Sequence, residues 1–305
     1  MMNKFYDVDL VRDALHCPVP SITPMFHKDG EIDWNSSEKL VEMCIEGGAK
    51  SLLVTAGDSL LTILTDDETM KLNQFVAKVA NGRAMVIAYS KFWCHKQMLE
   101  YAQACKAYGC DLVIPFYPDW AQSLSTEALT QCYREIGAIM PTMLLTNLCN
   151  GRGIPFAVLK ELTPEDGIVA LKDDAPAPYG KTALAITREK FAFMQGGRAI
   201  NYMDLEPFGA DGYLSVYARV FPDVSNRFWN AYHGGDIKKA VELVEQYDVA
   251  FFDMVASNGI NFSAGIQALF EVAGIGQRWR RSPYSSVTDQ QMEVVRDFCA
   301  AHNLV

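Results

Sequence analysis

Several features that mark membrane, nucleic-acid-binding and metal proteins are missing from this chain. No uninterrupted apolar stretch reaches the roughly 18 residues that a membrane-spanning helix needs. Lysine and arginine together number 27 against 37 aspartate and glutamate residues, so the formal net charge is -10 and a basic face for phosphate backbones is not expected. The five histidines show no paired ligand spacing. We therefore expect no membrane, nucleic-acid or metal partner.

Cysteine pairing is also missing. The eight cysteines include no pair at Cys-x-x-Cys spacing, so neither a redox motif nor a zinc ribbon is indicated. The first ten residues contain no apolar core of a secretory leader. These observations favour reduced, mostly buried thiols in a cytoplasmic protein.

Eight short apolar runs with β-type composition recur along the first 216 residues, and amphipathic segments with helical period separate most of them. The runs are 19–25, 51–56, 85–90, 112–117, 142–147, 168–172, 191–194 and 212–216, and the helical segments are 36–46, 67–80, 95–108, 126–139 and 156–162. Strands that are apolar on both faces and alternate with helices predict a parallel sheet. Eight such units predict closure into a (β/α)8 TIM barrel of the α/β class.

An open, doubly wound sheet is the alternative architecture. Such a sheet normally carries a glycine-rich turn, Gly-x-Gly-x-x-Gly, after its first strand. Here the first predicted strand ends in Thr-Pro-Met-Phe (23–26), without that motif. The barrel is therefore the preferred prediction.

The strand signals stop after residue 216, and helical patterns follow over 225–233, 236–247, 252–258, 266–272 and 289–302. The helix of 67–80 can be capped by Asp66. We predict a barrel over residues 1–220 and a C-terminal helical region over 221–305 that packs on it.

Lys172 is the most specific single feature, because it ends the apolar run Gly-Ile-Val-Ala-Leu-Lys (167–172) and two aspartates follow it. Barrel active sites lie at the C-terminal ends of the strands. A lysine that is desolvated there can attack carbonyl groups as a neutral amine. The alternative is an ordinary lysine that reaches the surface and pairs with Asp173 or Asp174.

Other polar residues follow the predicted strands and are candidates for the same site. They are Thr55, Gly57, Asp58 and Ser59 after the second strand, Tyr89 after the third, Tyr117 after the fourth, Thr146 and Asn147 after the fifth, and Gly196 after the seventh. A turn over 55–59 can present backbone N–H groups to a carboxylate, although it can also be a simple turn. Tyr89 and Tyr117 can be packing aromatics or proton donors.

Six segments, taken together, resemble the dihydrodipicolinate synthase / N-acetylneuraminate lyase family. They are Thr-Pro-Met-Phe-His-Lys-Asp-Gly-Glu-Ile-Asp (23–33), Thr-Ala-Gly-Asp-Ser (55–59), Pro-Phe-Tyr-Pro (115–118), Thr-Asn (146–147), Gly-Ile-Val-Ala-Leu-Lys-Asp (167–173) and Gly-Ala-Asp-Gly-Tyr-Leu-Ser (209–215). The resemblance implies a class I aldolase or lyase that acts on pyruvate or another 2-oxo acid, as a homotetramer or homodimer, without an external cofactor. It implies that Lys172 forms a covalent imine with the substrate.

The resemblance also assigns roles to the other candidates. Thr55 and the amides of Ala56 and Gly57 would bind the substrate carboxylate, and Tyr117 would act as a relay tyrosine near a subunit interface. The catalytic set is then Lys172, Tyr117 and Thr55. The candidate substrate-binding set is Ala56, Gly57, Asp58, Ser59, Tyr89, Thr146, Asn147, Gly196 and Leu214, and no metal ligand is expected.

Departures from the family pattern shape the functional hypotheses. Thr146 stands where the family usually has the tyrosine that moves the proton, and Ala56 replaces a threonine. The arginine of authentic dihydrodipicolinate synthases would fall at Gly151, with Arg152 one position away, so that particular activity is disfavoured. Tyr89 can return a phenol to the pocket from another wall. We expect a lyase, either an aldolase or a dehydratase, acting on a small 2-oxo or sugar-derived acid; the alternative is a catalytically weakened barrel that binds 2-oxo acids in a regulatory role.

Overall fold

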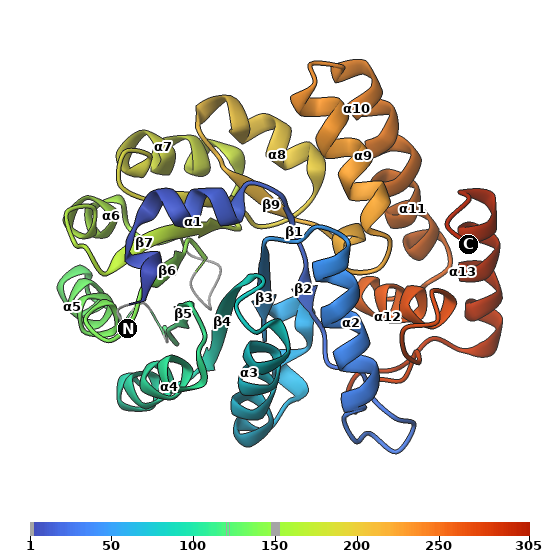
Figure 1. The fold of residues 1–305 in the computed structure, drawn as a ribbon, viewed down its shortest axis with the longest axis horizontal. Helices are drawn as coiled ribbons and strands as arrows, with labels where there is room; N and C mark the ends of the chain where they lie inside the picture. The colour runs from blue at the N-terminus through green and yellow to red at the C-terminus, as the bar shows by residue number, and fades with distance from the viewer. Residues whose placement is uncertain (1–2, 120, 122, 148–152) are drawn as a thin grey trace.

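One parallel sheet closes into a ring in the computed structural model, which describes residues 3–119, 121, 123–147 and 153–305. β1 (Pro18–Val19) pairs with β9 (Gly212–Leu214), whereas β2 (Ser21–Ile22) pairs with β3 (Ser51–Val54). Proline has no backbone N–H to donate to a ladder, and Pro20 separates these two short strands. The segment from 18 to 22 therefore serves as a single first strand that joins both ends of the sheet (Figure 1).

The remaining strands continue the ring in chain order and confirm the predicted barrel. They are β4 (Met85–Phe92), β5 (Leu112–Phe116), β6 (Thr142–Leu145), β7 (Ile168–Asp173) and β8 (Ala192–Gln195). Each of the eight predicted runs overlaps an observed strand. The third run is longer than predicted, because β4 continues to Phe92 across an irregularity in its register with β5.

Helices surround the ring on the outside (Figure 1). They are α2 (Trp34–Glu46), α3 (Asp66–Ala80), α4 (His95–Tyr108), α5 (Thr126–Gly137), α6 (Phe156–Leu162), α7 (Ala177–Thr187) and α8 (Ala199–Leu205). The five predicted barrel helices are confirmed, while α7 and α8 were not predicted. The cap of α3 was wrong, because Thr65 and not Asp66 accepts the hydrogen bond from the Glu68 amide, in a capping box with the Glu68 side chain.

The N-terminal end of the barrel is covered by a short 3-10 turn, Lys4–Tyr6, and by α1 (Val8–Leu15). Phe5, Val11 and Leu15 belong to the same buried cluster as inward-facing strand residues such as Ile87 and Met194. A second and larger cluster lies between the strands and the outer helices. The interior of the ring is thus filled by apolar side chains from its N-terminal end. Polar groups lie at the C-terminal ends of the strands, as in other barrels of this kind.

The C-terminal part is helical, as predicted, and lies beside the barrel (Figure 1). It contains α9 (Pro222–His233), α10 (Ile237–Leu243), α11 (Ala250–Ser257), α12 (Phe262–Val272) and α13 (Asp289–Ala301), and a π-helical turn, Val244–Val249, joins α10 to α11. Whether the chain divides at 220/221 stays a prediction. None of the helices in the described ranges is long and apolar enough to cross a membrane.

Candidate active site

Lys172 lies near the C-terminal end of β7, in register with Leu145 on β6 and Met194 on β8. Leu145 and Met194 both belong to the cluster inside the ring. The Lys172 residue is 4% exposed, and its Nζ pairs with both carboxylate oxygens of Asp174. The amine is therefore buried at the end of the barrel where chemistry is expected, whereas its partner Asp174 lies at the protein surface.

Asp174 is held in this position by residues from both neighbouring strand ends. Its backbone N–H donates to Thr146 Oγ1 at 2.9 Å. A Cβ atom on Gly196 would lie 1.6 Å from Asp174 Oδ1, so only a glycine leaves room for this carboxylate. The loops after β6, β7 and β8 thus meet around one ion pair, in which the amine is buried and the carboxylate is partly exposed.

Asp173 directly follows Lys172, but its side chain holds the turn in place and does not pair with the amine. Its Oδ1 accepts hydrogen bonds from Thr146 Oγ1 at 2.8 Å and from the Ala175 amide at 3.1 Å. Its Oδ2 is buried without a hydrogen-bond partner in the described part of the chain. Burial raises the pKa of Asp173 to about 6, although the two hydrogen bonds act in the opposite direction. This carboxylate faces away from the amine and fixes the turn.

The turn after β3 places the predicted carboxylate-binding residues at the same end of the barrel. Thr55 adopts a positive φ of 60°, which is a strained conformation for a β-branched residue. Its hydroxyl donates to backbone carbonyls and accepts from Asn73 Nδ2 at 3.2 Å, so the side chain supports the turn. No hydrogen bond among the described residues uses the Ala56 or Gly57 amide as donor. These two amides can therefore bind an anion.

Asp58 and Ser59 end this turn in different environments. The Asp58 carboxylate accepts from Ser21 Oγ at 2.7 Å and pairs with Arg219 Nη1 at 3.0 Å. The Arg219 side chain is only 1% exposed, so this pair anchors the turn to the protein interior. Ser59 Oγ is buried, without a partner in the described ranges. Asp58 acts mainly as an anchor of the turn in this arrangement.

Tyr89 projects into the ring from β4 and is 5% exposed. Its pKa is raised by burial first and then by the negative charges of Asp174 and Asp58 among its neighbours. Both carboxylates belong to the loops described above. A phenol from the β4 wall therefore shares the electrostatic environment of the Lys172 pair.

Tyr117, the predicted relay tyrosine, forms its hydrogen bond with a histidine. Its hydroxyl lies 3.1 Å from His95 Nδ1, and His95 Nε2 lies 2.7 Å from Glu135 Oε2. Its ring packs edge-on against Tyr133 in the outer cluster. The Tyr117 hydroxyl thus belongs to a tyrosine–histidine–glutamate chain that reaches α4 and α5, and among the described residues it forms no hydrogen bond with Lys172 or Asp174. Its catalytic role stays a prediction.

A cavity of about 190 Å³ opens at the C-terminal end of the barrel. Asp58, Gly196 and Leu214, all from the predicted binding set, line it together with Arg198 and Phe252. Lys172 does not line this cavity. Gly196 links the cavity to the amine, because it lines the cavity and packs against Asp174, the partner of Lys172. Asn147 forms an isolated bridge with Gly153 at the same end. Gly151 and Arg152 lie outside the described residues.

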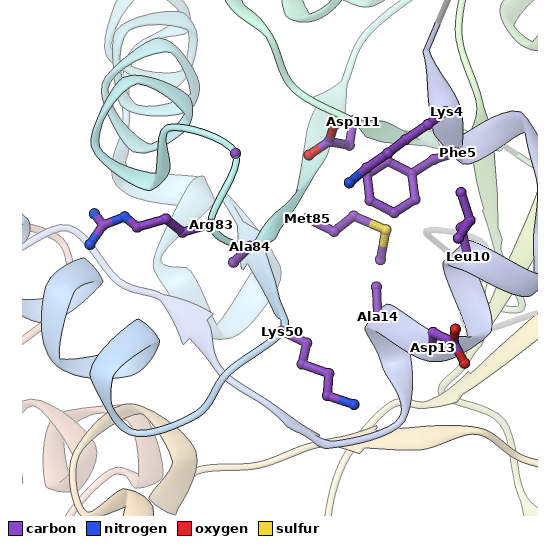
Figure 2. Close-up of a pocket in the computed structure, with 11 residues that line it drawn as sticks. Lys4, Phe5, Leu10, Asp13, Ala14, Lys50, Arg83, Ala84, Met85 and Asp111 are labelled. Carbon is purple, nitrogen blue, oxygen red and sulfur yellow. The ribbon is translucent and has the colours of Figure 1, made fainter.

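A larger cavity of about 490 Å³ lies at the opposite, N-terminal end of the strands (Figure 2). Lys50, Met85 and Asp111 line it at the starts of β3, β4 and β5, and Asp13 lines it from α1. It contains none of the predicted site residues. Among the described residues, no group of three or more His, Cys, Asp or Glu side chains is arranged to hold a metal ion.

Asp174 and His95 are the site residues that the sequence did not single out. Asp174 was considered only as a surface partner for Lys172, and His95 was placed on a helix without a role. Neither assignment could be improved from spacing alone, because both depend on how separate loops meet. The one available signal was the unusual second carboxylate directly after the lysine motif.

Comparison with known proteins identifies relatives of the whole barrel. The sequence model of the dihydrodipicolinate synthetase family matches residues 17–301. The 4-hydroxy-tetrahydrodipicolinate synthase 2 of Streptomyces coelicolor is 28% identical over 290 residues, which is 92% of each chain.

Two solved structures share the fold closely. The chloride-inhibited dihydrodipicolinate synthase of Acinetobacter baumannii, solved with pyruvate, superposes with a TM-score of 0.81 at 24% identity, covering 95% of this chain and 100% of that one. The N-acetylneuraminate lyase of Mycoplasma synoviae gives a TM-score of 0.82 at 16% identity over 96% of this chain and 99% of that one. At these identities the two structures establish the fold, and the match of the family model over most of the chain establishes the family. The chain belongs to the dihydrodipicolinate synthetase family, as an aldolase or lyase enzyme of that family.

Proposed function

We propose that the protein is a lyase that binds a small 2-oxo acid, pyruvate or a sugar-derived acid, as an imine of Lys172 Nζ. The observation that carries this proposal is the amine itself, 4% exposed at the C-terminal end of β7. An amine at this place can attack the carbonyl group of a bound substrate once it has given up a proton. The pyruvate complex of the Acinetobacter relative supports the choice of a 2-oxo acid.

The chemistry follows from the imine. Once the C2 carbon of the acid is bonded to nitrogen, the protonated imine withdraws electrons, and a carbon–carbon or carbon–oxygen bond near C3 can break to leave an enamine. The free amides of Ala56 and Gly57 would hold the carboxylate of the acid. Tyr89 would present its phenol from the β4 wall. The imine is the electron sink, so the mechanism requires no external cofactor.

Further proposals are based on what the resemblance to the family implies. We propose a homotetramer or homodimer in the cytoplasm, with Tyr117 close to a subunit interface. Thr55 acts through its support of the turn after β3, and Asn147 and Leu214 contribute to the walls of the site.

Reductive trapping tests the proposed function. Borohydride is added to the protein with pyruvate, and intact mass spectrometry measures the adduct. We expect one adduct on the wild type, none on Lys172→Ala, and an undiminished adduct on Lys50→Ala, which alters an exposed lysine at the other end of the barrel. An adduct that survives Lys172→Ala, or no adduct on the wild type, would overturn the proposal.

Turnover separates the lyase from the binding-only alternative. The protein is assayed against a panel of 4-hydroxy-2-oxo acids and sugar acids, with Lys172→Ala as the background. Cleavage or dehydration of any member above that background supports the lyase. Adduct formation without turnover of any member would support the regulatory alternative.

A further inference from the structure

We infer that Asp174 is a catalytic residue that carries the proton during imine formation. This inference rests on the proposed function and adds a residue that the family pattern does not supply. Asp174 contacts the reacting atom directly, because both of its oxygens lie within hydrogen-bond reach of Lys172 Nζ. No other carboxylate forms an ion pair with this amine among the described residues.

The proton balance of the reaction requires such a group. The resting ammonium gives one proton to Asp174, and the freed amine attacks C2 of the 2-oxo acid, so that a C–N bond forms and the carbonyl electron pair moves to oxygen. That oxygen takes the proton from Asp174 to give a carbinolamine. Asp174 then removes a proton from nitrogen and returns it to the hydroxyl group, which leaves as water. The carboxylate ends as it began.

The protein is built around this carboxylate. Thr146 Oγ1 accepts the Asp174 amide at 2.9 Å and donates to Asp173 at 2.8 Å, which orders the turn that directs Asp174 back to the amine. Gly196 leaves the space that Oδ1 occupies. Thr146 stands where the family usually has the tyrosine that moves the proton. It therefore positions Asp174, which takes over part of this proton transfer. Asp174 is also partly open, with 29% of its side chain exposed, so a substrate can approach it.

A passive counter-ion is the competing explanation, and it predicts the opposite effect of one substitution. Asp174→Asn keeps the shape and one acceptor oxygen but cannot take a proton. If Asp174 only stabilises a charged amine, its loss frees the amine and imine formation stays equal or becomes faster. If Asp174 carries the proton, imine formation becomes slower.

Timed borohydride quenching with pyruvate distinguishes the two explanations. At pH 7 we expect Asp174→Asn to form the adduct about 100-fold more slowly than the wild type, with a rate that continues to rise at pH values where the wild-type rate is level. Asp174→Ala should be similarly slow and partly restored by added formate, which can occupy the vacated position. Asp13→Asn, an exposed aspartate at the other end of the barrel, should match the wild type.

Each outcome decides between the explanations. A wild type that forms the adduct, together with Asp174→Asn at an equal or higher rate, would overturn the role of Asp174 and leave the proposed function standing. A wild type that forms no adduct would remove the proposed function and this inference with it. If Asp174→Asn does not fold, the formate response of Asp174→Ala decides, because an unrestored rate would contradict proton transfer.

Discussion

Neighbouring residues in the sequence have opposite roles in this site. Lys172 and Asp174 face one another at the inner end of β7, whereas Asp173 between them turns toward Thr146 and the Ala175 amide. The opposite directions of Lys172 and Asp173 follow from strand geometry, in which successive side chains point to opposite faces. The sequence could therefore predict that Lys172 is buried at a strand end. It could not predict that Asp174, beyond the strand, returns to the amine, because this depends on Thr146 and on the space at Gly196.

The buried Asp173 predicts a distinct pH dependence of stability. Its pKa is raised to about 6 by burial, so the folded state favours the protonated acid. The stabilising effect is therefore complete below the ordinary value of 3.8 and is lost as the pH rises through 6. The loss amounts to about 2 to 3 kcal/mol.

Asp173→Asn should remove this dependence, because the amide carries no charge at either pH. Urea unfolding at pH 4 and pH 7 measures this dependence as the difference between the free energies of unfolding of the variant and the wild type. We expect the variant to gain stability relative to the wild type on going from pH 4 to pH 7. Parallel pH curves for the two proteins would show that Asp173 has an ordinary pKa.

The strands of the barrel were easier to predict from the sequence than its helices. The eight strands could be predicted because parallel strands are apolar on both faces, and the lengths of α4 and α6 were predicted as observed. α7 was missed because its first turn contains Pro178 and its second Gly180, residues that usually interrupt helices. Proline is tolerated in the first turn, where no backbone N–H is needed. Gly180 gives space to Asp173 Oδ2, which would lie 2.4 Å from an added Cβ.

The loop between β8 and α8 offers a matched pair of glycines. A Cβ at Gly196 would collide with Asp174 Oδ1, whereas a Cβ at Gly197 would meet nothing within 4 Å. Both residues have backbone conformations that do not require glycine, since neither has a positive φ. Gly196→Ala should therefore displace Asp174 and slow the trapping of pyruvate by up to about 100-fold.

Gly197→Ala serves as the control and should change the rate far less. The comparison uses the timed trapping rate, with circular dichroism to verify that both variants fold. Equal rates for the two variants would mean that the position of Asp174 does not matter for the reaction.

An arginine helps to connect the C-terminal helices to the barrel. Arg281, between α12 and α13, makes a two-pronged contact with Glu68 on α3 and donates to the carbonyls of Ile63 and Gly30. Ile63 belongs to the segment that follows the carboxylate-binding turn. Spacing in the sequence alone could not show that Arg281 has its partner on α3. The oligomeric state stays a prediction.

The Arg281–Glu68 pair should stabilise the fold in a pH-dependent way. The Arg281 hydrogen bonds are the largest cause that lowers the pKa of Glu68, from 4.5 to about 2. The coupling is therefore present above pH 4.5 and is lost as the pH falls through 2. We expect about 2 kcal/mol of coupling at pH 7, because the contact is bidentate and partly buried.

A double-mutant cycle of Arg281→Ala and Glu68→Gln, measured by urea unfolding at pH 7, gives this coupling. Arg83 and Glu42 form a more exposed bidentate pair and provide the comparison. The exposed pair should couple less strongly, because water screens it. A coupling for Arg281–Glu68 no larger than that of the exposed pair would contradict a structural tie.

The proposed imine forms at one atom, Lys172 Nζ, and a crystal structure after a pyruvate soak tests it most directly. We expect continuous electron density from Nζ to C2 of the ligand, with the ligand carboxylate at the Ala56 and Gly57 amides and an Asp174 oxygen next to the nitrogen. A free amine still paired with Asp174, with pyruvate absent or bound only in the cavity at the N-terminal end of the barrel, would contradict it.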